Sequence, residues 1–146
     1  MTGRSGQAAP APRSLGLFSG RRSRGSWSLD GPRLTAFAIG DDGDLSGRRV
    51  FAELAEAPDG ICVDAEGAVW YATVPGRRCA RVSEGGRVLE SVPLDRGGFA
   101  CVLGGPDRRT LFVTAAQWRP DLPELVPAGS GQVCAAPVAV PGAGWP

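Results

Sequence analysis

Residues 60–73 read GICVDAEGAVWYAT, and residues 100–114 read ACVLGGPDRRTLFVT. Both stretches begin with a small residue, a cysteine and apolar residues, pass through a turn sequence, and end in an apolar strand that closes with threonine. Cys62 precedes Cys101 by 39 residues, and Trp70 precedes Phe112 by 42. Segments 33–37 and 78–82 repeat in the same way, 45 residues apart. Four strands in about 40–45 residues are typical of a β-propeller blade.

Short apolar runs separated by Gly, Pro and Asp predict further strands on both sides of this repeat. We predict strands at 34–39, 48–54, 61–64, 68–73, 79–83, 87–92, 99–103, 110–114 and 132–136. They form an outer hairpin, one complete four-strand unit, an inner hairpin and the start of another outer hairpin. No stretch has the 3.6-residue period of a helix. The predicted fold is therefore all-β, a partial β-propeller of about two and a half blades.

The first 33 residues differ in composition from the rest of the chain. They hold six Arg and one Asp, whereas the remaining residues hold ten Arg and fourteen Asp or Glu. A Ser-, Gly-, Pro- and Arg-rich segment without strand or helix period predicts disorder. We therefore divide the chain into a disordered tail (1–32), a propeller region (33–140) and a C-terminal tail (141–146). Arg21, Arg22 and Arg24 are expected to be solvated, because no aromatic residues interleave with them.

Composition excludes several classes of function. The 146 residues include no His, no Lys and no Asn, which excludes Ser-His-Asp triads, imidazole metal sites and lysine Schiff bases. A net charge of +1 argues against nucleic acid as a partner. No apolar run of about 18 residues is present, which argues against a membrane-spanning helix. Without a recognisable secretion signal, we expect a cytoplasmic protein.

Four cysteines, at positions 62, 79, 101 and 134, form no CxxC pair. A zinc knuckle, which needs closely spaced cysteine ligands, is therefore not expected. Three of the cysteines lie in apolar stretches. We interpret them as buried free thiols rather than disulfides.

Several acidic or aromatic groups have both a functional and a structural interpretation. Asp41–Asp44 resembles half of a calcium-binding loop, but a hairpin turn is favoured because the later glutamate and the flanking helices are missing. Asp64 and Glu66 could form a carboxylate pair, but they lie in a turn sequence and are expected to be solvated. Trp70 and Tyr71 could stack on a sugar, but adjacent strand residues are expected to pack on opposite faces of a sheet.

Residues 58–70, PDGICVDAEGAVW, resemble the gluconolactonase, regucalcin (senescence marker protein) and luciferin-regenerating-enzyme family. Three further segments are similar to the same family in the same order. They are LSGRRVF at 45–51, GGRVL at 85–89 and GGPDRRTLFVT at 104–114. The resemblance covers residues 33–140.

This resemblance implies a six-bladed propeller, of which the chain would form a C-terminal portion. It also implies hydrolysis of small sugar lactones or related esters with one divalent metal, calcium or zinc. Asp59 matches the family's metal-binding aspartate, which is also its proposed catalytic base. The alternative is that Pro58-Asp59-Gly60 simply favours a turn.

The sequence departs from the family at the other metal ligands, which are a glutamate of the first blade and an asparagine. The first blade has no counterpart here, and the chain contains no Asn. Because calcium prefers six to eight oxygen ligands, we expect an incomplete, inactive fragment that does not bind the metal tightly. The alternative is a non-catalytic module whose open blade edges pair with another copy or a partner.

Overall fold

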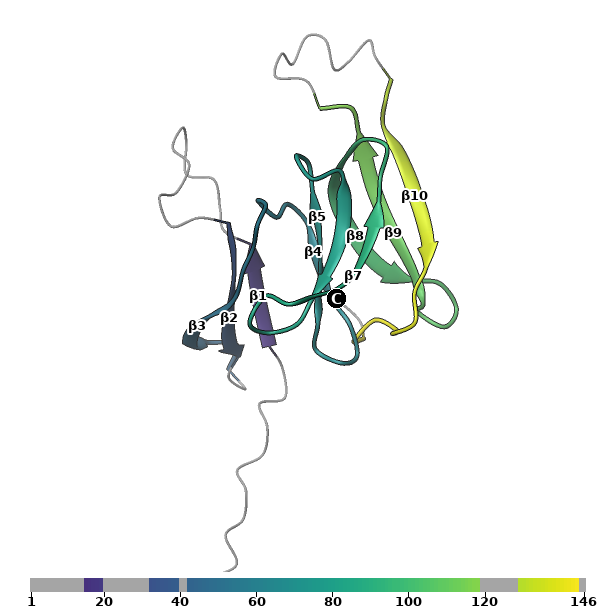
Figure 1. Ribbon diagram of the computed structural model, residues 1–146. Coiled ribbons are helices and arrows are strands. Elements are labelled where there is room, and N and C mark those ends of the chain that lie inside the picture. The colour runs from purple at the N-terminus through teal and green to yellow at the C-terminus, as the bar shows by residue number, and fades with distance from the viewer. Residues whose placement is uncertain (1–14, 20–31, 40–41, 119–128, 145–146) are drawn as a thin grey trace, which may run out of the picture.

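The computed structural model describes residues 15–19, 32–39, 42–118 and 129–144, and these residues are organised entirely by β-strands (Figure 1). The strands are β1 (Leu15–Ser19), β2 (Arg33–Ile39), β3 (Leu45–Glu53), β4 (Ile61–Val63), β5 (Val69–Thr73), β6 (Arg78–Val82), β7 (Val88–Pro93), β8 (Gly97–Gly104), β9 (Thr110–Ala116) and β10 (Gln132–Pro137). Within the described ranges, no helix long and apolar enough to cross a membrane is found.

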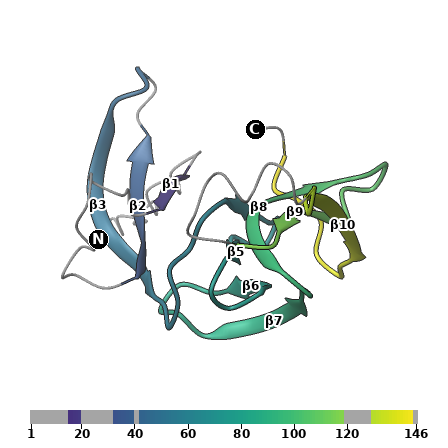
Figure 2. The same ribbon diagram turned by 90° about the horizontal axis from the view of Figure 1, so that it is seen from above.

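Three antiparallel sheets make up the fold. The first has the order β1-β2-β3, the middle sheet β4-β5-β6-β7, and the third β10-β9-β8. Figure 2 shows the three sheets side by side, with β3, β7 and β10 on the outside and β1, β5 and β8 closer together. The nine strands predicted from the sequence are all present, with ends that differ by a few residues. The prediction of an all-β partial propeller is confirmed.

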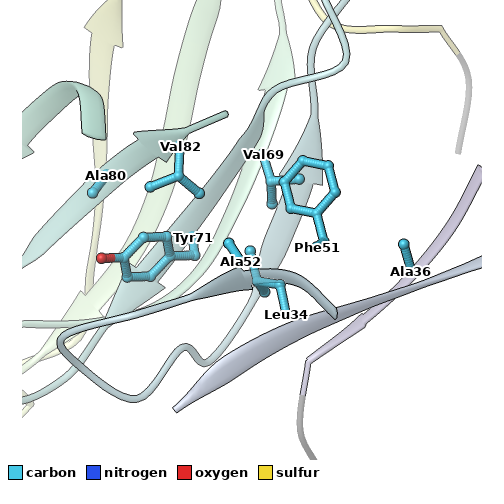
Figure 3. Packing of buried hydrophobic residues seen from close by; sticks show 8 residues of the cluster. All are labelled: Leu34, Ala36, Phe51, Ala52, Val69, Tyr71, Ala80 and Val82. Atoms are coloured by element: carbon cyan, nitrogen blue, oxygen red, sulfur yellow. The ribbon is translucent and has the colours of Figure 1, made fainter. Parts of the chain in front are cut away.

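The middle sheet is buried on both faces because its strands alternate between two cores. On one face, Val69 and Tyr71 of β5 pack against Leu34 and Phe51 of the first sheet (Figure 3). On the other face, Trp70 joins the core that the middle sheet forms with the third sheet. All five residues of β5 are buried. This two-sided burial is the reason the sheets stack as consecutive blades.

The structure differs from the sequence expectation at β1, which lies in the segment assigned to a disordered tail. All five residues of β1 pair with β2, from Leu15 opposite Ala38 to Ser19 opposite Leu34. The pairing satisfies the backbone groups that would otherwise form an open edge on β2. Tail residues 1–14 and 20–31, with Arg21, Arg22 and Arg24 among them, lie outside the described residues.

Residues 141–144, assigned to a C-terminal tail, also differ from the expectation because they are hydrogen-bonded to the sheets. The Ala65 amide donates to the Pro141 carbonyl at 2.8 Å, and the Ala143 amide donates to the Val63 carbonyl at 3.1 Å. The Gly142 amide donates to the Arg108 carbonyl at 2.9 Å. The segment therefore ties the β4–β5 turn of the middle sheet to the β8–β9 turn of the third sheet.

Candidate functional site

Asp59 is an exposed residue two positions before β4, and backbone hydrogen bonds hold its segment to β5 and β8. Its amide donates to the Ala72 carbonyl of β5 at 2.9 Å, and the Ala72 amide donates to the Gly60 carbonyl at 2.9 Å. The Gly60 amide donates to the Phe99 carbonyl of β8 at 2.7 Å. The backbone that carries the Asp59 carboxylate is thus fixed where the middle and third sheets meet.

The glycine after Asp59 is required by packing. A Cβ at Gly60 would lie 2.5 Å from the Ala100 Cα of β8, which is too close for any side chain. Residues 58–60 form no hydrogen-bonded turn, although Pro-Asp-Gly suggests one in the sequence. The motif therefore serves here as a close entry into β4 and not as a turn.

The segment that leads into Asp59 is anchored to the sheets by two contacts. The Leu54 amide donates to the Pro32 carbonyl at 2.9 Å, next to the first sheet. The Glu56 carboxylate accepts a hydrogen bond from the Arg78 Nε of β6 at 3.0 Å. Residues 54–60 consequently cross from the first sheet to the middle sheet along a defined path.

The described residues do not fit the divalent metal that the family resemblance implies. Across the described ranges, no group of three or more His, Cys, Asp and Glu side chains is placed to hold a metal ion. Asp59 offers two carboxylate oxygens, whereas calcium takes six to eight oxygen ligands and zinc three or four protein ligands. Asp59 alone therefore does not provide a site for either metal.

Asp64 and Glu66, considered above as a carboxylate pair, both form ion pairs with Arg81. The expectation that Asp64 is solvated is wrong. The Asp64 side chain is fully buried, and its Oδ2 accepts from Arg81 Nε at 2.6 Å. Its Oδ1 accepts from the amides of Glu66 at 2.9 Å and Ala68 at 3.1 Å. Glu66 is exposed and accepts from Arg81 Nη2 at 2.8 Å. The hydrogen bonds of Arg81 to Asp64 and, to a smaller extent, to Glu66 raise the pKa of the Arg81 guanidinium above its ordinary value.

The remaining sequence candidates have the structural roles that were favoured. Trp70 and Tyr71 are buried on opposite faces of β5, so packing is confirmed for both. In the loop at 41–44, Asp41 lies outside the described residues. The Asp42 carboxylate accepts from the Asp44 amide at 3.0 Å, as in a hairpin turn.

Three cysteines, Cys62, Cys79 and Cys101, lie together in the core between the middle and third sheets, which the spacing in the sequence did not predict. Cys62 Sγ donates to Cys101 Sγ across 3.8 Å, and Cys101 Sγ also contacts the Gly60 and Trp70 carbonyls at 3.6 Å. Cys79 is buried in the same core. All four cysteines are free thiols, as predicted, but of the three expected to be buried only Cys79 and Cys101 are, and Cys62 is partly buried.

The environment of these thiols raises their pKa values. The pKa of Cys62 is raised by its hydrogen bond to Cys101 and then by burial. The hydrogen bond to Cys62 lowers the pKa of Cys101, but the hydrogen bond to Cys79 and burial outweigh it, so the net shift is upward. The thiols therefore act as packing groups and weak donors.

Comparisons with known proteins agree with this architecture. Regucalcin of Xenopus laevis is 39% identical over 80 residues, which are 51% of this chain and 26% of regucalcin. Among solved structures, a luciferin-regenerating enzyme superposes with a TM-score of 0.61 at 25% identity, over 75% of this chain and 39% of the enzyme. A gluconolactonase of Xanthomonas campestris superposes with a TM-score of 0.51 at 31% identity, over 62% of this chain and 29% of that protein.

The chain spans about a quarter of the length of the regucalcin that it matches. The family model described as the SMP-30/Gluconolactonase/LRE-like region matches residues 30–117, which contain Asp59 and run from the start of β2 to the end of β9. The chain belongs to the SMP-30/gluconolactonase/LRE-like family.

Proposed function

We propose that Asp59 belongs to the active site of a hydrolase that opens small sugar lactones or related esters. The observation that carries this proposal is an exposed carboxylate on a backbone held rigidly between two sheets. Family membership and a 31% identical neighbour described as a gluconolactonase support the same reaction class. Within the part of the chain that the structure describes, the core beside Gly60 holds thiols with raised pKa values and apolar groups, which are poor nucleophiles at ordinary pH.

In this proposal, Asp59 acts as a general base. A carboxylate beside the ester can accept the proton of the water that attacks the carbonyl carbon. The hydrogen bonds of the Asp59 and Gly60 amides to β5 and β8 hold the base in position while the proton moves. Held this way, the backbone that carries the carboxylate does not have to be ordered when substrate binds.

The chain by itself is proposed to be inactive and not to bind calcium or zinc tightly. Asp59 is one donor where several are needed, and no cluster among the described residues supplies the others. The activity would therefore require further blades that complete the donor set and the substrate pocket.

An assay of lactone hydrolysis tests this proposal. The full chain is compared with a fusion in which the preceding part of Xenopus regucalcin is joined to residue 33, using gluconolactone and a pH-stat. We expect hydrolysis at the buffer rate for the chain and catalysed hydrolysis for the fusion. In the fusion, Asp59→Asn should lower the rate at least about 100-fold, the scale of general-base catalysis.

The matched control is Asp107→Asn in the exposed β8–β9 turn, where the amide can still accept the hydrogen bond of the Arg109 amide. It should leave the rate of the fusion unchanged. Full activity of the Asp59→Asn fusion, or a catalysed rate with the unfused chain, would refute the proposal.

A second candidate is a non-catalytic role through pairing with another copy of the chain. It is favoured by Val102 and Val133, which lie on a sheet face and are 50% and 68% exposed.

A further inference from the structure

The thiols of Cys62 and Cys101 meet at the seam between the middle and third sheets. Just before them along the chain, the Gly60 amide donates to the Phe99 carbonyl at 2.7 Å. A Cβ at Gly60 would lie 2.5 Å from the Ala100 Cα, so the two backbones are in direct contact there. Cys62 and Cys101 follow within two residues of this contact, which brings their side chains together.

The sulfur atoms of Cys62 and Cys101 are 3.8 Å apart, which is van der Waals contact. A disulfide bond is about 2.0 Å long, so the two atoms need to approach by less than about 2 Å to form one. The strands that carry them are fixed by pairing within their own sheets, β4 with β5 and β8 with β9. The two thiols are thus held against each other at a distance from which a bond can form.

The thiols of this core differ in their access to solvent. Cys62 is partly buried, whereas Cys101 is 9% exposed and Cys79 is 0% exposed. A small polar oxidant therefore reaches Cys62 before the other two. Cys101 is in contact with Cys62 and can react with it next.

We propose that Cys62 is an oxidation site for peroxides and that Cys101 is its resolving thiol, so that oxidation joins the middle and third sheets by a disulfide bond. The contact of the two sulfur atoms and the difference in their access to solvent carry this proposal. The bond would lie next to the Gly60 carbonyl, which Cys101 Sγ contacts at 3.6 Å. This inference does not depend on the proposed lactone hydrolysis.

The reaction consumes one peroxide and two thiols. The Cys62 sulfur attacks one oxygen of hydrogen peroxide, the O–O bond breaks, and the released hydroxide takes up the thiol proton and leaves as water. This step leaves a sulfenic acid on Cys62. The Cys101 sulfur then attacks the Cys62 sulfur, the S–O bond breaks, and a second water leaves with the proton of Cys101. The two thiols supply the two electrons that reduce the peroxide.

The two steps should differ in rate. The raised pKa of Cys62 keeps its thiol protonated, and a thiol is a weaker nucleophile than a thiolate, so the first step should be slow. The second step joins two atoms that are already in contact and should be fast. The sulfenic acid should therefore not accumulate, and Cys62 should end as a disulfide instead of the irreversible sulfinic acid.

Disulfide mapping of the full chain tests the proposal. The chain is kept overnight in millimolar hydrogen peroxide at pH 8, the remaining thiols are blocked with iodoacetamide in urea, and trypsin is added. Because the chain contains no Lys, cleavage after Arg places the four cysteines in four different peptides, at 50–77, 79–81, 97–108 and 110–146. We expect peptides 50–77 and 97–108 to be joined with the loss of two hydrogen atoms, and dithiothreitol to separate them.

Peroxide treatment of the chain unfolded in urea is the control for the native geometry, since it should join the four peptides in several pairs. In the native chain, the Cys62–Cys101 pair should exceed every other pair at least about tenfold, because these thiols are already in contact. A predominant bond to Cys79 or Cys134 would overturn the proposal. So would the recovery of native Cys62 without a bond, either unreacted or as sulfinic acid.

Two variants test the roles of the thiols. Cys101→Ala removes the resolving thiol and should leave Cys62 as a sulfenic acid that dimedone traps. The matched control is Cys134→Ala, which removes a partly buried thiol on β10, separated from β8 by β9, and should give the parent yield of the Cys62–Cys101 bond. Loss of the bond in the control, or no trapped Cys62 in a folded Cys101→Ala chain, would contradict the assignment. If circular dichroism shows that Cys101→Ala does not fold, the mapping of the parent chain decides.

The bond should also stabilise the fold. A link between Cys62 and Cys101 closes a loop in the unfolded chain and lowers its conformational entropy. The oxidised chain should therefore unfold at a higher urea concentration than the reduced chain, and dithiothreitol should restore the lower midpoint. An equal or lower midpoint after oxidation would show that the native contact does not accommodate the bond, against the proposal.

Discussion

The sulfur atoms of Cys62 and Cys101 lie 3.8 Å apart on β4 and β8, which belong to two different sheets. Cys62 is opposite Trp70 in the middle sheet, whereas Cys101 is opposite Val113 in the third, so the two residues do not hold matching register positions. Their contact lies beside the residue that follows Asp59, because Cys101 Sγ also contacts the Gly60 carbonyl at 3.6 Å. The candidate site and the thiol pair therefore share one seam between the sheets.

The thiol pair should resist alkylation in the folded protein. Its raised pKa values keep Cys62 and Cys101 protonated at pH 8, and the thiolate is the reactive form. With iodoacetamide at pH 8, we expect these two residues to be labelled only after unfolding in urea. Peptide mass spectrometry measures this, and rapid labelling of Cys62 in the native chain would contradict the assignment.

The raised pKa values of Cys62 and Cys101 also predict that the folded protein is less stable in alkaline solution. A thiol whose pKa is raised by folding stabilises the native state fully below pH 9, its ordinary value, and loses that contribution progressively as the pH rises toward the folded value. Burial also raises the pKa of Tyr71, which adds a loss in the same direction. The urea midpoint should therefore be lower at pH 10 than at pH 8.

The double variant Cys62→Ala/Cys101→Ala is the control for this pH dependence. Its urea midpoint should fall less between pH 8 and pH 10 than that of the parent chain. The remaining fall is the part caused by Tyr71. If the variant and the parent lose the same stability over this interval, the thiols are not responsible.

Gly60→Ala should destabilise the fold by about 1–3 kcal/mol, the cost of overpacking a close contact. The added Cβ would meet the Ala100 backbone, which cannot move without separating β4 from β8. Gly131→Ala is the matched control, because a Cβ at Gly131 meets nothing within 4 Å. Urea unfolding followed by tryptophan fluorescence compares them, and equal midpoints would show that β8 does not approach Gly60 this closely.

Asp64→Ala should cost about 3–5 kcal/mol, because it leaves the Arg81 guanidinium buried without its main partner. Glu66→Ala removes the exposed partner of the same arginine and should cost less than about 1 kcal/mol. Chemical unfolding of both variants measures the difference. Similar losses for the two would contradict the buried role of Asp64.

The sequence predicted those features of the fold that depend on local pattern. The alternation in VWYAT at 69–73 places Trp70 and Tyr71 on opposite faces, and the structure confirms this. Gly- and Asp-rich turns mark the hairpins because few other residues adopt their backbone angles, as at Gly43 with φ of 87°. The family resemblance singled out Asp59, which neither composition nor spacing would have distinguished from a turn residue.

Features that depend on contacts between sheets were not predictable from the pattern. The sequence DAEG at 64–67 suggests a solvated turn, but Asp64 is buried because Arg81 of β6 meets it at 2.6 Å. Nothing local to Gly60 indicates that Ala100 lies against it. Pairing of β1 with β2 depends on an open strand edge, and LGLFS at 15–19 carries no alternating pattern of its own.

Calorimetric titration of calcium into the full chain tests most directly whether Asp59 is one donor of an incomplete metal site. We expect no binding at micromolar concentrations, because the described residues form no group of three or more His, Cys, Asp and Glu side chains that could hold a metal ion. Saturable binding of one calcium ion per chain with a micromolar Kd, abolished by Asp59→Asn, would contradict it.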